Sequence, residues 1–514
     1  MPAGAEMDPL ETRNRCGDAV AESGAERQIR DSLLYLLPLV VSNLLPFLTL
    51  PIFTRILTRE DYGVLALAQV YAVFVGGIAN LGMNSAYERN YFQHRGSTKD
   101  AASLLFSLLL FVLFTTTVLG ILTYLNRETL SAWIVGSPGH GDILFWAFLN
   151  QCAMNLVIFY QLSLRNAGES VPYIRYTVAI SLLNLLLSLY FVVVAHIGVI
   201  GLVYAPLIAN SLIFILLSRR YIRAWSFSLS WPLFMDSLKI SYPLTPRIFL
   251  GAASQQFDKY MIGLLSTLGG VGVYRIGQQV ASLVFSYMTQ LEHVFIPGTY
   301  RRMFDLKEEG KEAVGRYLTS FFYVSISVAF LICLFSEEVI SILTPPAFHD
   351  AIDIVTILSL YYGILFFGKI TGVQLVYLKK TPITSLLTLS ALALNVAINI
   401  PFIYAWGAIG AAWGTMLAGV VSCAVSFFVA QHYYGIRWEY GKIIPVLVLF
   451  FSAAMITVVL RNHVDYPQRL LLKLLLASAY VYAGVWIRVI TAENIGHLRN
   501  LLHLRSRIAA QRNG

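Results

Sequence analysis

Apolar runs of bilayer length follow one another along almost the whole chain, and they constrain its fold more than any other feature. A membrane-spanning helix needs about 20 apolar residues, and we count fourteen runs of roughly that length. Backbone groups in lipid must hydrogen-bond within their own segment, so each run is predicted to be a helix. We predict an all-α, polytopic membrane protein. The predicted spans are 33–54, 62–82, 101–125, 143–164, 173–195, 199–218, 240–265, 271–296, 317–335, 352–378, 384–404, 407–430, 443–459 and 470–489.

The composition agrees with a membrane protein and argues against a nucleic-acid partner. Of the 514 residues, 57% are hydrophobic and only 13% are charged, and the mean hydropathy is +0.67. Soluble globular domains are less apolar and more highly charged than this. The formal net charge of +9 could suit nucleic acid. However, the Lys and Arg residues lie in short loops between apolar runs, as the positive-inside rule requires.

The same charges predict the orientation. If the amino terminus is cytoplasmic, eighteen Lys and Arg residues fall in inside loops and six outside. We therefore expect a multi-pass membrane protein with both termini cytoplasmic. Residues 1–28 are predicted to be a disordered tail, and 493–514 a basic amphipathic tail on the anionic inner leaflet. The six outside charges are Arg55, Arg59, Arg127, Arg461, Arg469 and Lys473.

An internal repeat relates the two halves of the chain. A shift of about 209 residues superimposes residues 62–69 on 271–278 and residues 198–201 on 407–410. Parallel repeats of this kind form two bundles around an axis along the membrane normal, with a substrate site between them. We predict six-helix bundles at 29–224 and 237–435, and two further helices within 441–492. The repeat matches Gly63 with Gly272, Gln69 with Gln278, Asn80 with Thr289, Asn84 with His293, and Gly198 with Gly407.

Two adjacent spans, 240–265 and 271–296, are unusually polar for membrane helices. At 100° per residue, their polar side chains gather on one face of each helix. Ionisable groups inside a membrane usually face a bundle interior or an aqueous path. We therefore predict a charged, water-filled lumen along these spans. The polar faces contain Arg247, Gly251, Ser254, Gln255, Asp258 and Lys259 on the first span, and Arg275, Gln278, Gln279, Ser282, Ser286, Thr289 and His293 on the second.

Several short motifs resemble one transporter family. They are Pro51-Ile-Phe-Thr-Arg55 continuing to Asp61-Tyr-Gly63, then Leu81-Gly82, Asp258-Lys-Tyr260 and Val271-Gly-Val-Tyr274. This pattern is similar to that of the polysaccharide transporter (Wzx-type) flippases of the multidrug/oligosaccharidyl-lipid/polysaccharide exporter superfamily. The resemblance implies a V-shaped fold of two bundles and alternating access. It also implies that the cargo is an undecaprenyl-diphosphate-linked oligosaccharide, the repeat unit of an O-antigen or exopolysaccharide.

The candidate binding residues follow from the chemistry of such a cargo. Its diphosphate needs cations, and the planar fork of arginine binds two oxygens at once. Arg247 and Arg275 are the first candidates, followed by Arg55, Arg89, Lys259 and Lys369. Each can instead be a snorkelling side chain or half of an ion pair. Gln69, Asn80, Asn84, Gln255, Gln278, Ser282 and Thr289 can bond sugar hydroxyls, although such side chains also join membrane helices to each other.

Two titratable residues are candidates for ion coupling. Asp258 can bind a cation or a proton, or it can pair with Lys259 or Arg247 to lower the cost of burial, and we favour pairing. His293 is a weaker candidate for a proton relay.

No Walker loop, metal-ligand cluster or nucleophile elbow occurs in the sequence, so we expect neither an enzyme nor a cofactor. The expected partners are the lipid-linked oligosaccharide, membrane lipids, and polysaccharide polymerase and chain-length machinery. Two other functions stay open, a lipid II flippase and a cation-coupled multidrug exporter of the same superfamily. A membrane-embedded sugar polymerase or glycosyltransferase is disfavoured, because the predicted outer loops are short and nearly uncharged.

Overall fold

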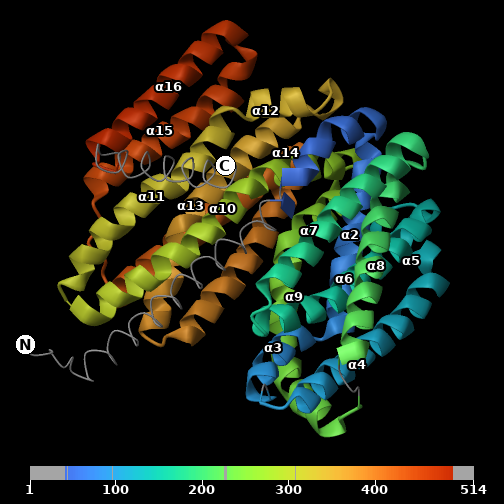
Figure 1. The fold of residues 1–514 in the computed structure, drawn as a ribbon. Helices are drawn as coiled ribbons and strands as arrows, with labels where there is room; N and C mark the ends of the chain where they lie inside the picture. Colours follow the sequence, from blue (N-terminus) through green and yellow to red (C-terminus); the bar gives the residue numbers. More distant parts are fainter. Residues whose placement is uncertain (1–40, 43, 95, 225–227, 307, 490–514) are drawn as a thin grey trace, which may run out of the picture. The chain divides into compact units, whose positions relative to one another are not determined.

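The computed structural model describes residues 41–489, apart from 43, 95, 225–227 and 307 (Figure 1). In this part of the chain the secondary structure is helical, without strands. Ten of its helices are long and apolar enough to cross a membrane. The all-α membrane fold is therefore confirmed. The predicted tails, 1–28 and 493–514, lie outside the described residues, as does the start of the first span. That span is seen from Leu44 to Ile56.

The amino-terminal helices fall where the apolar runs predict them. The predicted spans 62–82, 101–125, 143–164, 173–195 and 199–218 coincide with long helices, and short helices lie between them. These helices are α2 Arg59–Asn80, α3 Met83–His94, α4 Thr98–Leu125, α5 Arg127–Ile134, α6 Gly141–Asn166, α7 Ser170–Leu189 with η2 Tyr190–Val194, and α8 Gly201–Ala224.

The second half of the chain begins with two very long helices. They are α9 Trp231–Leu265 and α10 Leu268–Leu306. Because α9 and α10 are rich in polar residues, they do not belong to the ten helices above. The segment 301–316, which lies between two predicted spans, is helical at both ends. Helix α10 continues to Leu306 because its backbone bonds persist past Pro297, and the next helix begins at Gly310.

The remaining helices complete the predicted spans. One of them, α14, contains the two predicted spans 384–404 and 407–430. Its two helical segments meet at Gly407, where φ is 58° and ψ is −132°. The helices are α11 Gly310–Leu334, α12 Ser336–Leu343, α13 Ala351–Tyr377, α14 Thr381–Tyr433, α15 Tyr440–Val458 and α16 Tyr466–Trp486.

The contacts divide the chain into two compact units. Unit 1 comprises 1–57 and 68–253, and unit 2 comprises 58–67 and 254–514. The division falls inside α2 and α9, whereas the sequence placed it in the loop before residue 237. Unit 2 therefore contains the first turns of α2 and the last turns of α9. The proposed six-helix boundaries themselves stay a prediction.

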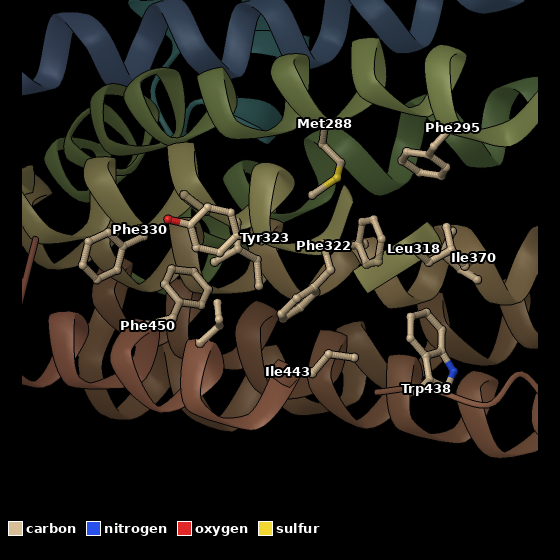
Figure 2. Packing of buried hydrophobic residues seen from close by; sticks show 14 of the residues in the cluster. Met288, Phe295, Leu318, Phe322, Tyr323, Phe330, Ile370, Trp438, Ile443 and Phe450 are labelled. Atoms are coloured by element: carbon tan, nitrogen blue, oxygen red, sulfur yellow. The ribbon is translucent and has the colours of Figure 1, made fainter. Parts of the chain in front are cut away.

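Each unit has its own apolar core. In unit 1, α3, α4, α6 and α8 bury side chains that include Tyr87, Leu105, Phe159 and Leu217. In unit 2, Phe322 of α11, Ile370 of α13 and Phe450 of α15 are fully buried in one cluster (Figure 2). These cores give each unit a fixed framework on which polar side chains can be held inside the helices.

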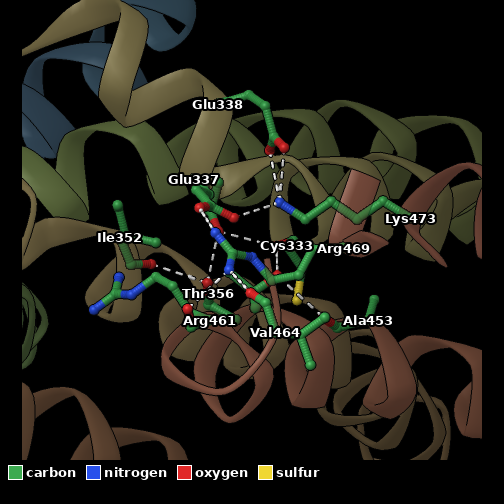
Figure 3. Close-up of polar contacts among 12 residues, drawn as sticks. Cys333, Glu337, Glu338, Ile352, Thr356, Ala453, Arg461, Val464, Arg469 and Lys473 are labelled. Atoms are coloured by element: carbon green, nitrogen blue, oxygen red, sulfur yellow. Dashed lines mark hydrogen bonds and ion pairs between the residues drawn. The ribbon is translucent and has the colours of Figure 1, made fainter. Parts of the chain in front are cut away.

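Helix α16 is attached to unit 2 by buried charges and by paired tyrosines. Lys473 Nζ lies 2.9 Å from Glu337 Oε2 and 2.8 Å from Glu338 Oε1, and Arg469 Nη2 lies 2.7 Å from Glu337 Oε1 (Figure 3). We call these four residues the balanced cluster, because two cations meet two carboxylates. Further along α16, the ring of Tyr480 stacks on that of Tyr323, and each hydroxyl donates to the other residue's backbone carbonyl.

Candidate functional site

The candidate site lies in unit 2, where the end of α9 meets the start of α10. Only two residues separate these helices, so the chain reverses and brings Asp258 of α9 beside Tyr274 of α10. The hydroxyl of Tyr274 donates to Asp258 Oδ2 at 2.7 Å. This contact fixes the two helices next to each other at the point where the sequence is most polar.

Asp258 is held by neutral donors. It is only 5% exposed, and besides Tyr274 its carboxylate accepts from Thr415 Oγ1 at 3.1 Å and from Asn399 Nδ2 at 3.5 Å. The oxygen Oδ1 of Asn399 is buried without a hydrogen-bond partner. The ion pair that we favoured between Asp258 and Lys259 is not formed at close range, because the Lys259 ammonium donates to Gln256 Oε1 at 2.8 Å instead.

Lys259 and Arg275 form a second feature of the site, which we call the cation pair. The charge of Lys259 is influenced by Arg275, which repels it, and by the Asp258 carboxylate, which attracts it. The nitrogen Nη1 of Arg275 is buried and has no hydrogen-bond partner, and its guanidinium carbon lies 5.9 Å from the centre of the Tyr62 ring. Among the residues that the structure describes, neither cation has a carboxylate within ion-pair distance. The site therefore has two cations for one carboxylate, that of Asp258.

Two glycines bring α2 and α10 together beside the cation pair. A Cβ on Gly63 would clash with the backbone oxygen of Leu268, and a Cβ on Gly272 would clash with that of Arg59. The contact is reciprocal, because each glycine lies one turn after the residue that the other glycine meets. These are the two glycines that the sequence repeat superimposes. Their close approach places Tyr62 next to Arg275.

The other polar residues of the predicted α10 face have mixed surroundings. Gln278 is hydrogen-bonded to Tyr362 of α13. Ser282 and Thr289 donate to carbonyls of their own helix, at 2.7 Å and 2.9 Å. Gln255 and His293 are exposed. The side chain of Arg247 lies outside the described residues, so the first of the two leading arginines stays a prediction.

Lys369 has a partner that the sequence analysis missed. Its Nζ lies 2.9 Å from Oε2 of Glu292 on α10 and 5.7 Å from the centre of the Phe285 ring. Of the alternatives given for Lys369 in the sequence analysis, the structure therefore shows the ion pair. Tyr274, Asn399 and Thr415 were also missed as partners of the predicted residues. Of these three residues, only Tyr274 could have been identified from the sequence, because it directly precedes Arg275.

The candidates of unit 1 are described by themselves. Gln69 is exposed, whereas the Oδ1 atoms of Asn80 and Asn84 are buried without a hydrogen-bond partner. Arg89 donates to Asn90 Oδ1 at 2.7 Å and lies 3.7 Å from an Asp236 carboxylate oxygen.

Arg55 is exposed, and its guanidinium donates to the carbonyl of Pro51. That the residues of unit 1 line a wall opposite the cation pair stays a prediction.

The sequence and the fold both match known proteins. A family model described as "Polysaccharide biosynthesis protein" matches residues 52–353. Among curated proteins, none matches the chain. Among solved structures, the chain is similar to the lipid II flippase MurJ in an inward closed conformation. That comparison has a TM-score of 0.67 and 15% identity and covers 90% of this chain and 99% of that chain.

Two further solved structures are transporters of the MOP superfamily. An inward-facing multidrug resistance MATE family transporter has a TM-score of 0.60 and 18% identity, covering 77% of this chain and 97% of that chain. A transporter from Pyrococcus furiosus has a TM-score of 0.54 and 17% identity, covering 79% and 95%. At such identities the likeness shows the fold, and that fold is the one of MOP superfamily transporters.

Proposed function

Because the chain belongs to the polysaccharide biosynthesis protein family, we propose that it is a flippase for a lipid-linked oligosaccharide. The cargo is an undecaprenyl-diphosphate-linked repeat unit of a surface polysaccharide. It crosses the bacterial inner membrane from the cytoplasmic to the outer leaflet by alternating access, and both termini of the protein are cytoplasmic. The solved structures with this fold are those of transporters, which supports transport rather than enzymatic catalysis.

The observation that carries this proposal is the cation pair. A charged side chain inside a membrane costs about 3 kcal/mol even on the lowest scales, and a second cation beside it adds repulsion. Lys259 and Arg275 have no carboxylate at ion-pair distance within the described structure. An anionic ligand supplies the missing negative charge, and a diphosphate carries enough oxygens for both residues. Arg275, with its planar fork, is the principal ligand.

The experiment that tests this proposal is the substitution Arg275→Ala. We expect loss of surface polysaccharide in a bacterial strain that depends on this protein, with normal membrane insertion. Arg175→Ala is the matched control, because Arg175 is an exposed arginine of α7 outside the site. Normal polysaccharide from the Arg275→Ala strain would contradict the proposal.

Lipid II, the cargo named for one structural relative, is the second candidate, because its head group is also attached through a diphosphate. Depletion of the protein distinguishes the two. Accumulation of an undecaprenyl-linked repeat unit supports the first cargo, and accumulation of lipid II supports the second. A multidrug exporter for organic cations is disfavoured, because the cation pair would repel such a cargo.

We also propose that Asp258 couples transport to a cation or proton gradient. The buried Asp258 carboxylate accepts from two hydroxyl groups and from Asn399 Nδ2, and Oδ1 of the same Asn399 is buried without a hydrogen-bond partner. Oxygen ligands are those that small hard cations prefer. Asp258→Asn keeps the shape and removes the charge, so transport should no longer respond to collapse of the gradient. Unchanged dependence on the gradient in this variant would contradict the role.

A further inference from the structure

The membrane span that begins with α2 is interrupted after Asn80. Helix α2 ends at Asn80 and α3 begins at Met83, although together they form one apolar segment, Arg59–His94. The two residues between them are left-handed, with φ of 45° at Leu81 and 69° at Gly82. Residues other than glycine rarely adopt this conformation, and they keep it only where the surrounding structure fixes it. The Leu81-Gly82 motif of the sequence is therefore a break in a helix.

Two threonines of neighbouring helices hold this break. Thr115 of α4 donates to the carbonyl of Ala79 at 2.6 Å, and Thr245 of α9 donates to that of Leu81 at 3.0 Å. Each hydroxyl also has a carbonyl of its own helix as an alternative acceptor, at 3.0 Å and 2.9 Å respectively. If the break closed into a continuous helix, the two freed carbonyls would accept from backbone N–H groups. The exchange would thus leave these carbonyls and hydroxyls bonded.

The second half of the chain contains the corresponding segment without a break. The shift of 209 residues places residues 81–82 on 290–291, which lie inside the continuous helix α10. It also places Thr115 on Val324, which has no hydroxyl that could hold a break. One segment of the repeat can therefore be broken or straight, depending on the side chains around it.

Helix α2 connects this break with the cation pair. Its residues 58–67 belong to unit 2 and the rest of the helix to unit 1. In unit 2, the Tyr62 ring centre lies 5.9 Å from the guanidinium carbon of Arg275, and Arg59 pairs with Asp350 at 3.1 Å. A ligand bound at Arg275 therefore acts on the first turns of α2. A displacement of these turns is taken up where the helix is interrupted, since the ends of helices absorb changes in backbone angles.

We propose that the Leu81–Gly82 break is a hinge, which is broken before the diphosphate of the cargo binds at Arg275 and straight afterwards. This inference rests on the proposed function. The cost of the left-handed turn opposes the gain from the two hydroxyl bonds, so a ligand that prefers one form shifts the population. Asn80 and Asn84 flank the hinge, and their Oδ1 atoms are buried without a hydrogen-bond partner among the described residues. Straightening changes the arrangement of these two candidate sugar ligands when the diphosphate binds.

The test measures the distance between spin labels on Ile78→Cys and Phe92→Cys by pulsed electron paramagnetic resonance. Both side chains are exposed, at 46% and 50%, and they lie on either side of the hinge. The purified full-length chain carries Cys16→Ser, and its other three cysteines are buried. We expect farnesyl diphosphate to increase the population with a separation of about 21 Å, that of a continuous helix. The control pair Gln290→Cys and Phe304→Cys, in α10, should show no change.

Two substitutions should shift the hinge in opposite directions. Thr245→Val removes the bond to the Leu81 carbonyl, so without ligand the ratio of straight to broken chains should rise about fivefold. Thr245→Ser keeps the hydroxyl and should behave as the parent protein does. Leu81→Gly relieves the left-handed residue, so the ratio should fall about tenfold and less surface polysaccharide should be exported. Both hinge variants keep Arg275 and should still bind farnesyl diphosphate.

Binding of farnesyl diphosphate, followed by intrinsic tryptophan fluorescence, separates the two proposals. If Arg275→Ala binds this probe more weakly than the parent protein does, but the probe leaves the distance across the hinge unchanged, the hinge is overturned and the flippase proposal stands. If Arg275→Ala binds it as tightly as the parent protein does, the diphosphate site at Arg275 is overturned, and the hinge with it.

Discussion

Unit 2 contains two groups of charged side chains that are built in opposite ways. In the balanced cluster, Glu337, Glu338, Arg469 and Lys473 neutralise each other over distances below 3 Å, and Lys473 is 0% exposed. In the cation pair, Lys259 and Arg275 repel each other, and Arg275 Nη1 is buried without a partner. Balanced charges stabilise the packing of a helix, whereas an uncompensated positive charge favours the binding of an anionic ligand. A charge that is compensated by a carboxylate thus indicates a structural role, and a charge without such compensation indicates a site.

The largest expected effect comes from breaking the balanced cluster. Lys473→Met leaves Glu338 without its cation, and we expect the free energy of unfolding to fall by about 3–5 kcal/mol. Thermal unfolding of the purified protein measures this change. Lys442→Met is the control, because Lys442 forms a partly exposed pair with Glu439, and its loss should cost less than about 1 kcal/mol. Equal effects of the two substitutions would show that the balanced cluster does not anchor α16.

A smaller effect is expected from separating the helices beside the cation pair. Gly272→Ala forces α10 away from the backbone of Arg59, at a cost of about 1–3 kcal/mol. It should also weaken binding of farnesyl diphosphate, because Arg275 lies less than one turn further along the helix. Gly372→Ala is the control, since a Cβ there meets open space. If Gly272→Ala bound farnesyl diphosphate as tightly as the parent protein does, the cation pair would not depend on the close contact between α2 and α10.

The smallest effect concerns the uncharged attachment of α16. Tyr480→Phe removes the hydrogen bond to the Tyr323 carbonyl, which is 2.8 Å long, and keeps the stacked ring. We expect the free energy of unfolding, measured by thermal unfolding, to fall by about 1 kcal/mol. Tyr482→Phe, at a residue that is 72% exposed, should have no effect. If Tyr480→Phe lowered the free energy of unfolding as much as Lys473→Met does, the balanced cluster would not contribute more than the tyrosine pair to the attachment of α16.

Much of the fold follows from periodic features of the sequence. Apolar run length placed the helices, because lipid allows few alternatives for the backbone. The repeat also predicted local geometry. Gly198 and Gly407, which it superimposes, both have positive φ, at 69° and 58°, and Gly63 and Gly272 meet each other's helices. Where two helices approach closely, or where the backbone is left-handed, glycine is favoured. Such glycines therefore recur in both halves of the sequence even where the surrounding side chains differ.

The partners of the charged residues could not be predicted in the same way. Asp258 is bonded by Asn399 and Thr415, which follow it by 141 and 157 residues, and helical periodicity says nothing about contacts between distant helices. The six cations predicted to lie outside show the same limit. Most of these cations have acidic partners in the structure, such as Asp350 for Arg59 and Asp353 for Arg461. Their charge is thus neutralised by residues that the sequence analysis did not connect with them.

The melting temperature of purified Arg275→Ala, measured with and without farnesyl diphosphate, tests the central claim most directly. Removal of an unpaired charge relieves repulsion in the cation pair, so we predict that without ligand the variant melts at or above the temperature of the parent protein. With ligand, the parent should gain stability and the variant should not. A variant that melts well below the parent, or that gains as much from the ligand, would show that Arg275 is a structural residue and not a ligand for an anion.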